Sequence, residues 1–207
     1  MLPLILDLKS LESSVDRRII RKFNDGRTNI LFVGRVVPNK KLEDHIRLAE
    51  HYRRYVDAKS RFIFVGRTDL VPRYYAMLRA LLVEYGMRRD QFLFTGQVSD
   101  HELATYYRTA RAYVALSEHE GFCVPLVEAM AANVPILAYD AAAVGETLGG
   151  AGVCFSPKDL EYAAELLGLL VYDDTLRTSV IVGQQRRLTN FTTERAAAAL
   201  DRMLNEL

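Results

Sequence analysis

The sequence predicts an α/β protein with a Rossmann-like parallel sheet of about six strands, helices on both faces and a helical C-terminal segment. The first observation behind this prediction is that short apolar runs typical of strands alternate with helical patterns over most of the 207 residues. The second is that the pattern becomes entirely helical after Phe155. Strands separated by helices of about ten residues or more imply right-handed crossovers, which join parallel strands of one sheet.

The individual elements follow from local patterns. Strands are expected at 30–33, 62–65, 92–95, 112–116, 135–139 and 153–155. A helical period runs over 42–49 and again over 75–85, where Gly86 is a stop signal. The segment Ser99-Asp100-His101-Glu102 is typical of a capping box that opens a helix over 103–109. The C-terminal helices are expected at 159–172, 174–188 and 193–207.

Length and composition fit one globular domain with a sizeable core, since half of the residues are hydrophobic and 26% are charged. A net charge of +1 without a block of basic residues gives no indication of a nucleic-acid partner. Cys123 and Cys154 lack CxxC spacing, so neither a disulfide framework nor a zinc site is predicted. A reducing, cytoplasmic location fits this cysteine usage.

No targeting or membrane-spanning segment is predicted. The apolar run within residues 1–7 is too short for the core of a signal peptide and has no basic region before it. No run approaches the ~18 apolar residues that a membrane-spanning helix needs. We therefore expect no transmembrane segment, while a peripheral membrane role stays open.

The segment 117–130 carries the strongest functional signal. It places Glu120 and Glu128 eight positions apart, after a strand-like run and around a helix that opens at Pro125. Open α/β sheets bind ligands at the edge where a strand ends and the next helix begins. Free N–H groups at the helix start suit an anion, and carboxylates accept hydrogen bonds from hydroxyls. A ligand with phosphates and several hydroxyls would fit this corner.

This segment resembles the signature of a known family. Glu-x7-Glu with Gly121-Phe122 after the first Glu looks like the large group of retaining glycosyltransferases built on two Rossmann-like domains, the GT-B type, and like its group 1, GT4-like members. The match is to their C-terminal, nucleotide-sugar-binding domain. Four further stretches are similar to that domain and occur in the same order: Phe32-Val33-Gly34-Arg35 with Pro38-Asn39-Lys40-Lys41, Phe64-Val65-Gly66, Phe94-Thr95-Gly96-Gln97-Val98, and Glu146-Thr147-Leu148-Gly149-Gly150-Ala151-Gly152.

The resemblance assigns the donor's phosphates to the turn that carries Gly34, Arg35 and Lys40, and the donor's base to the turn that precedes Val98. Gly34 lets the backbone approach the ligand closely, because it has no Cβ. Arg35 and Lys40 would grip the diphosphate and offset charge on the departing nucleoside diphosphate. Alone, this pair could equally be two solvated loop cations, but the Glu pair favours the ligand. Val98 would offer backbone contacts to the base. The sequence has no Asp-x-Asp motif, so a metal-independent site without a cofactor is expected.

The same resemblance assigns the sugar end of the donor to the Glu pair. Glu128 would face the ribose, because one carboxylate can accept from two vicinal hydroxyls. Glu120 would be the catalytic residue near the transferred sugar, where it positions hydroxyls or supports developing positive charge. Gly121, Phe122 and Cys123 would offer main-chain N–H groups to the donor. We interpret Cys123 as a steric substitute for a glycine that is common there in the family, because no supporting base accompanies the thiol.

Residues outside these motifs are interpreted as support. Tyr107 and Ser117 are candidates to back the site, although packing explains both equally well. His119 is expected to face solvent. His45 is expected at a helix surface or start, as are His51 and His101, and the histidines form no ligand cluster.

The resemblance also predicts the domain organisation. Residues 1–28 match an interdomain linker with a short helix over 13–23, and residues 29–207 match the donor-binding domain. The acceptor-binding N-terminal domain has no counterpart here, so a truncated enzyme or half of a split enzyme is expected, with negligible turnover alone. An apolar face for the absent domain is expected near Leu200, Met203 and Leu204. The partners would be a nucleoside-diphosphate sugar and a glycan or lipid-linked acceptor.

Two other classes of function stay open. A nucleotide-sugar epimerase can share this fold, although Glu120-Gly121-Phe122 favours glycosyl transfer. A glycan phosphorylase would carry a pyridoxal-binding Lys in a recognisable context, and none is found. A non-catalytic nucleotide-sugar-binding module is the second alternative, against which the complete set Arg35, Lys40, Glu120 and Glu128 argues.

Overall fold

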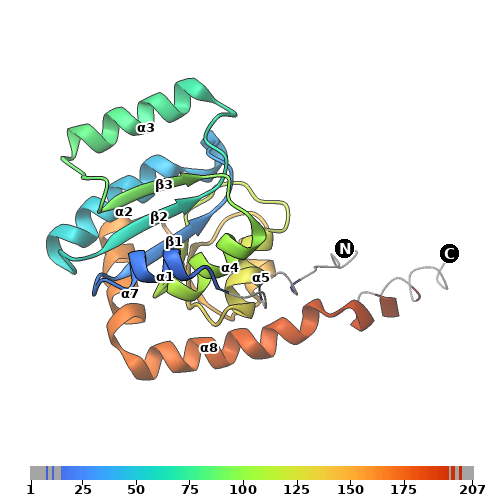
Figure 1. Ribbon diagram of the computed structural model, residues 1–207. Coiled ribbons are helices and arrows are strands. Elements are labelled where there is room, and N and C mark those ends of the chain that lie inside the picture. The colour runs from blue at the N-terminus through green and yellow to red at the C-terminus, as the bar shows by residue number, and fades with distance from the viewer. Residues whose placement is uncertain (1–7, 9–10, 12–14, 196, 199–200, 202–207) are drawn as a thin grey trace.

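The computed structural model describes residues 8, 11, 15–195, 197, 198 and 201 (Figure 1). Six strands form one sheet in the order β3-β2-β1-β4-β5-β6, and all neighbouring strands pair in parallel. The strands are β1 (Asn29–Val33), β2 (Arg61–Val65), β3 (Phe92–Gly96), β4 (Ala112–Ala115), β5 (Ile136–Tyr139) and β6 (Val153–Phe155). The predicted Rossmann-like sheet is confirmed, and each predicted strand overlaps an observed one.

Helices cover both faces of the sheet, as predicted (Figure 1). One face carries α2 (Leu42–Tyr55), α3 (Pro72–Glu84) and α7 (Leu160–Tyr172). The other carries α1 (Arg17–Phe23), α4 (Asp100–Thr109), α5 (Val124–Ala131) and α6 (Val144–Leu148). The long helix α8 (Asp174–Leu188) packs against α7 and α5, and short 3-10 turns lie at η2 (Pro38–Lys40) and η3 (Thr189–Phe191).

Alternation along the strands builds two cores. In β2, Phe62 and Phe64 enter the cluster under α2 and α7, whereas Ile63 and Val65 enter the cluster under α4 and α5. Successive side chains of a strand point to opposite faces, so a strand buried on both faces is apolar throughout. This explains why the strands appear in the sequence as continuous apolar runs.

The strand order creates the crevice in which a ligand can bind. The chain runs outward from β1 to β2 and β3, then returns to place β4 on the other side of β1. The loops that leave β1 and β4 therefore diverge to opposite faces, and they open a gap at the carboxyl edge. The two strongest sequence motifs lie on these two loops.

Capping residues account for the observed helix starts. Asp16 caps α1 by accepting from the N–H groups of Arg18 (2.7 Å) and Ile19 (3.4 Å), so the helix predicted over 13–23 begins at Arg17. The predicted capping box is present, with Ser99 and Glu102 bonded reciprocally. Because Ser99 is the cap, α4 begins at Asp100, three residues before the predicted start.

The C-terminal predictions hold as far as the structure describes them. The helices predicted over 159–172 and 174–188 are confirmed as α7 and α8. Of the third, predicted over 193–207, the described residues 193–195, 197, 198 and 201 are helical. The apolar face predicted near Leu200, Met203 and Leu204 lies outside the described residues, as does most of the segment before α1.

One prediction about this layer is wrong in part: His45 lies near the start of α2, as expected, but it is fully buried and not at the helix surface. Its ring contacts Phe32 and Phe64 edge-on, at 4.7 and 5.3 Å between ring centroids. Its Nδ1 lies 3.0 Å from the carbonyl oxygen of Lys41, and its Nε2 lies 3.4 Å from that of Val114. Burial lowers the pKa of His45 to about 4, so the ring is neutral at neutral pH.

This burial predicts acid sensitivity of the fold. The pKa of His45 in the folded chain lies below its ordinary value of 6.5, so its contribution to stability is complete above pH 6.5 and is lost as the pH falls through about 4. Between pH 7 and pH 5 this loss amounts to about 2 kcal/mol. Urea denaturation at both pH values should show it in the natural chain and in a His119→Gln control. A His45→Gln variant that keeps the same pH dependence would contradict the prediction.

Candidate functional site

Glycine backbones shape one side of the carboxyl edge. Gly34 follows β1, and its N–H donates to the Val65 carbonyl at 2.9 Å; the N–H of Gly66 after β2 donates to the Gly96 carbonyl at 3.0 Å. A Cβ on Gly66 would lie 2.0 Å from the carbonyl oxygen of Gly34, and its φ of +147° is open only to glycine. The backbones of three neighbouring strands therefore meet directly at this edge.

Asn39 ties the turn after β1 to the loop after β4. Its carbonyl accepts from the N–H of Glu118 at 3.1 Å, and its side-chain amide donates to the His119 carbonyl at 3.1 Å. These residues are about 80 positions apart in the chain. The reciprocal bonds hold the η2 turn against the segment that carries the Glu pair.

This link brings Lys40 and Glu120 into direct contact. Lys40 Nζ donates to Glu120 Oε1, and their side chains are only 14% and 8% exposed. The predicted diphosphate cation and the predicted catalytic carboxylate are thus neighbours. An ammonium has three N–H donors, so Lys40 can hold Glu120 and still offer donors to an anion.

A charge network extends this contact along the rim. Lys41 Nζ lies 3.0 Å from Glu118, and Lys158 Nζ lies 3.3 Å from Glu118 and 2.9 Å from Asp44. The hydrogen bond from Lys41 lowers the pKa of Glu118 despite partial desolvation. Lys41 has a left-handed backbone (φ 51°), the conformation a glycine would adopt at this position.

Glu128 lies on the first turns of α5 and is held by Tyr107 of α4. The Tyr107 hydroxyl donates to Glu128 Oε2 at 2.8 Å and lies 3.3 Å from the Pro125 carbonyl. Burial raises the pKa of Glu128 above its ordinary value, while the hydrogen bond from Tyr107 acts in the opposite direction. Tyr107 is fully buried and bonds Glu128 Oε2, whereas Glu128 Oε1 has no hydrogen-bond partner among the described residues.

The residues between the two carboxylates form the turn into α5. Gly121 is exposed, and a Cβ there would meet nothing within 4 Å, so the space beside it is open. The Phe122 carbonyl accepts from Thr147 Oγ1 at 2.5 Å, and its ring meets Phe191 edge-on at 5.7 Å. Cys123 is the N-cap of α5, with φ 62°.

The steric interpretation of Cys123 agrees with its surroundings. The residue is 7% exposed, and burial raises the pKa of its thiol to about 12. Thiolate is the reactive form of cysteine, so this thiol is unreactive at neutral pH. Its left-handed backbone suits the glycine for which it substitutes.

Arg35 and Val98, two further predicted donor-binding residues, are less tightly tied to the other site residues. Arg35 is exposed, and its side chain has no hydrogen-bond or ion-pair partner within the part of the chain that the structure describes. Val98 packs its half-buried side chain against the core under α4, which leaves its peptide groups as the features that can meet a ligand. Among the described residues, no side-chain hydrogen bond or ion pair joins Arg35 or Val98 to the Lys40–Glu120 pair.

Sequence reasoning missed four residues that hold the site together. They are Asn39, Thr147, Lys158 and Phe191. Asn39 and Thr147 occur within the stretches that resemble the family, but only their tertiary contacts show their roles. Ser117, a predicted supporting residue, is buried, and its hydroxyl has no partner among the described residues.

The described residues offer neither a metal site nor a membrane span. No three His, Cys, Asp or Glu side chains come together in a way that could hold a metal ion. None of the described helices is long and apolar enough to cross a membrane.

The Rossmann-like sheet, with charged and glycine-rich turns at its switch point, belongs to the class of open α/β folds that typically bind ligands at the carboxyl edge. The chain belongs to the glycosyl transferases group 1 family, whose sequence model matches residues 16–187. The family predicted from the motifs is therefore correct at this level.

Its relatives include O-antigen chain mannosyltransferases. The chain is 33% identical over 96 residues to O-antigen chain mannosyltransferase B of Escherichia coli, covering 46% of this chain and 25% of that one. It is 30% identical over 148 residues to O-antigen chain mannosyltransferase RfbU of Salmonella typhimurium, which covers 71% of this chain and 39% of that one. The chain thus spans well under half the length of these relatives.

Solved structures share the fold at low sequence identity. Sucrose-phosphate synthase of Thermosynechococcus elongatus matches with a TM-score of 0.80 at 21% identity, over 99% of this chain and 51% of that one. Anabaena HepE in complex with UDP-glucose also matches with a TM-score of 0.80, at 18% identity, over 98% of this chain and 56% of that one. This chain therefore has the α/β architecture of one half of a GT-B glycosyltransferase.

Proposed function

We propose that this chain is the donor-binding domain of a retaining glycosyltransferase. The whole enzyme would transfer a hexose from a nucleoside-diphosphate sugar to a glycan or lipid-linked acceptor in the cytoplasm. The observation that carries the proposal is the contact of Lys40 with Glu120 beside the tethered Glu128. It supports the proposal because a cation suited to phosphates and two carboxylates suited to hydroxyls lie at one edge of the sheet.

The phosphate end of the donor would lie between the turns after β1 and β4. Arg35 is exposed and free to move, and Lys40 retains N–H donors after its contact with Glu120. Two such cations stabilise the charge that develops when a nucleoside diphosphate leaves. We propose that they do so without a metal ion; loss of nucleotide-sugar binding on adding a chelator would contradict this part.

The sugar end would lie over the start of α5. Glu128 would accept from the ribose hydroxyls through the oxygen that Tyr107 leaves free. Glu120 would face the transferred sugar, where a carboxylate supports positive charge at the anomeric carbon. Its ion pair with Lys40 holds it beside the proposed phosphate cation. The open space at Gly121 leaves room for the donor.

Titration of the folded chain with nucleotides tests the proposal. Calorimetry with UDP, GDP, ADP and dTDP should show binding of one nucleotide in preference to the others. GDP-mannose is the first complete donor to test, because relatives of this chain are mannosyltransferases. If a demonstrably folded chain binds no nucleotide and no nucleotide sugar, the proposal is contradicted. Robust transfer by this chain alone would contradict the part of the proposal that assigns the acceptor groups to another domain.

Removing the Tyr107 hydroxyl tests how Glu128 is held. A Tyr107→Phe variant loses a hydrogen bond to the charged carboxylate, so nucleotide affinity at pH 7 should fall roughly fivefold. The pKa of Glu128 should rise further, because that bond favours the ionised form. On acidification, the variant should therefore begin to lose nucleotide affinity at a higher pH than the natural chain does. Tyr106→Phe on the neighbouring position is the matched control; equal losses in both variants would refute a specific role.

A further inference from the structure

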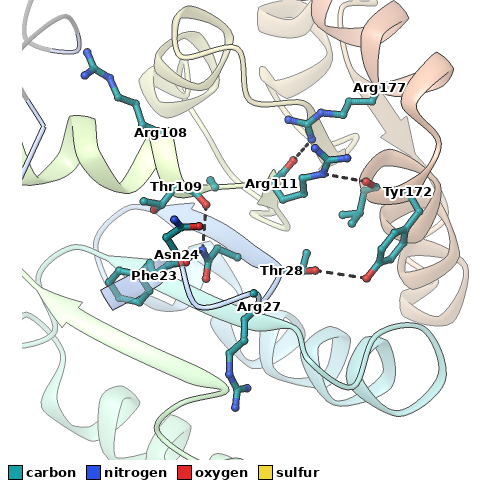
Figure 2. Close-up of a pocket in the computed structure, with 13 residues that line it drawn as sticks. Phe23, Asn24, Arg27, Thr28, Arg108, Thr109, Arg111, Tyr172 and Arg177 are labelled. Atoms are coloured by element: carbon teal, nitrogen blue, oxygen red, sulfur yellow. Dashed lines mark hydrogen bonds between the residues drawn. The ribbon is translucent and has the colours of Figure 1, made fainter. Parts of the chain in front are cut away.

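A cavity lies at the edge of the sheet opposite the candidate site, where β1 and β4 begin (Figure 2). Its volume is about 510 Å³, and it is lined where α1, α4 and α7 end. Four arginines surround it, and the described lining residues include no Asp or Glu. These arginines are Arg27, Arg108, Arg111 and Arg177. A cavity of this size can hold a small molecule.

Two of the arginines lie next to each other. Arg177 Nη1 donates to the backbone carbonyl of Arg111 at 2.5 Å, and Figure 2 shows the two guanidinium groups close together. Burial lowers the pKa of Arg177, and the nearby Arg111 charge acts in the same direction. Arg111 has an exposed carboxylate partner, Asp174, at 3.1 Å. Arg177 has no carboxylate within 4 Å in the part of the chain that the structure describes.

Capping of helix ends explains part of this arrangement. Arg111 Nε donates to the Val171 carbonyl at 3.0 Å, and Asn29 donates to the carbonyls of Phe23 and Thr109 at 3.0 and 3.1 Å. These bonds satisfy the carbonyls at the ends of α7, α1 and α4, whose partial negative charge would otherwise repel an anion. Capping leaves the remaining N–H donors of Arg177 unexplained, because a guanidinium carries five.

Two hydroxyl groups complete the donor set. Thr28 Oγ1 and Tyr172 Oη lie 3.5 Å apart on the same wall of the cavity (Figure 2). Arg27 and Arg108 stand at the rim, and each already has a partner: Asp90 at 2.7 Å and the Leu11 carbonyl at 3.1 Å. The inner donors are on Arg177, Thr28 and Tyr172, and no Asp or Glu is among the described lining residues. The nearest acidic groups lie outside the lining: Asp57 interacts with the Tyr172 hydroxyl, and Asp174 pairs with Arg111.

We propose that this cavity binds a phosphate-bearing ligand, whose oxygens are held by Arg177 and Arg111 with the hydroxyls of Thr28 and Tyr172. A phosphate group presents several acceptor oxygens in the geometry that guanidinium forks recognise. The cavity is larger than one phosphate, so the ligand is a phosphate ester or a diphosphate. It would come from a soluble phosphorylated compound or from a phospholipid headgroup. This site is separate from the carboxyl edge and does not depend on the proposed donor.

Pyrophosphate is the first probe, and NMR distinguishes the two edges of the sheet. Amide signals of 27–29, 109–111 and 171–177 report on this cavity, whereas those of 34–40 report on the carboxyl edge. Shifts at the cavity should saturate in the natural chain, and Arg177→Gln should weaken this binding about tenfold or more. Arg73→Gln, an exposed arginine on α3, is the matched control and should leave it unchanged.

A second variant and a vesicle assay complete the test. Thr28→Asp places a carboxylate in the lining of the cavity, next to Tyr172, and should abolish pyrophosphate binding in a chain that remains folded. Co-sedimentation with phosphatidylcholine vesicles that contain phosphatidic acid, dependent on Arg177, would identify a lipid source; binding of pyrophosphate or glucose 1-phosphate without vesicle binding would identify a soluble one. The proposal is overturned if neither ligand shifts the cavity signals, or if Arg177→Gln and Thr28→Asp bind as the natural chain does.

Discussion

Replacing Gly66 with alanine is expected to destabilise the fold by about 4 kcal/mol, the largest effect we predict for a single added methyl group. The new Cβ would lie 2.0 Å from the Gly34 carbonyl oxygen, a backbone atom that cannot move aside without disturbing β1. Its φ of +147° adds the strain of a conformation that residues other than glycine avoid. A loss of this size is a large share of the stability of a typical domain.

Gly86→Ala separates the clash from the strain. Gly86 also has a positive φ, +60°, but a Cβ there would meet nothing within 4 Å. This control should therefore lose only about 1 kcal/mol. Urea denaturation of both variants gives the comparison, and similar losses in the two would show that the contact between Gly66 and Gly34 is not tight.

Replacing Glu128 with alanine is expected to weaken nucleotide binding roughly 100-fold, which corresponds to about 3 kcal/mol for the hydrogen bonds of a charged acceptor. The proposed role of Glu128 is to accept from the ribose hydroxyls through the oxygen that Tyr107 leaves free. The substitution also leaves the buried Tyr107 hydroxyl without its acceptor at 2.8 Å. Loss of affinity for the nucleoside alone, as well as for its diphosphate, would localise the effect to the ribose.

Two further variants make this result specific. Glu128→Gln keeps the shape of the side chain and removes its charge, so it should bind between the natural chain and the alanine variant. Glu165→Ala removes an exposed carboxylate in the middle of α7 and should bind normally. Calorimetry on folded samples is the measurement. Unchanged affinity in Glu128→Ala would remove the carboxylate from the proposed site, whereas an equal loss in Glu165→Ala would indicate a general effect.

Local patterns were sufficient to predict the secondary structure and the position of the site in the sequence. The apolar runs located all six strands, and the pair Ser99 and Glu102 located the start of α4 through a capping box. Both signals involve residues within a few positions of one another, where side-chain alternation and helix capping act directly. The spacing of Glu120 and Glu128 likewise depends only on one turn and the helix that follows.

The contacts between these motifs could not be predicted in this way. Asn39 bonds to His119 and Glu118 because β1 and β4 are neighbours, although they are separated by two strands in the sequence. Tyr107 reaches Glu128 only because α4 and α5 cover the same face of the sheet. His45 was misplaced for the same reason, since a polar residue near a helix start resembles a surface residue until the strands beneath it are in position.

The sequence by itself determined the fold class, the order of the elements and the membership in a glycosyltransferase family, because periodicity and motif spacing record local geometry. Only the tertiary structure decided which charges meet: Lys40 with Glu120 at one edge of the sheet, and Arg111 with Arg177 at the other. Neither pair is close in sequence. Strand order brings the first pair together and the packing of α8 the second, and both depend on how the whole chain buries its two apolar cores.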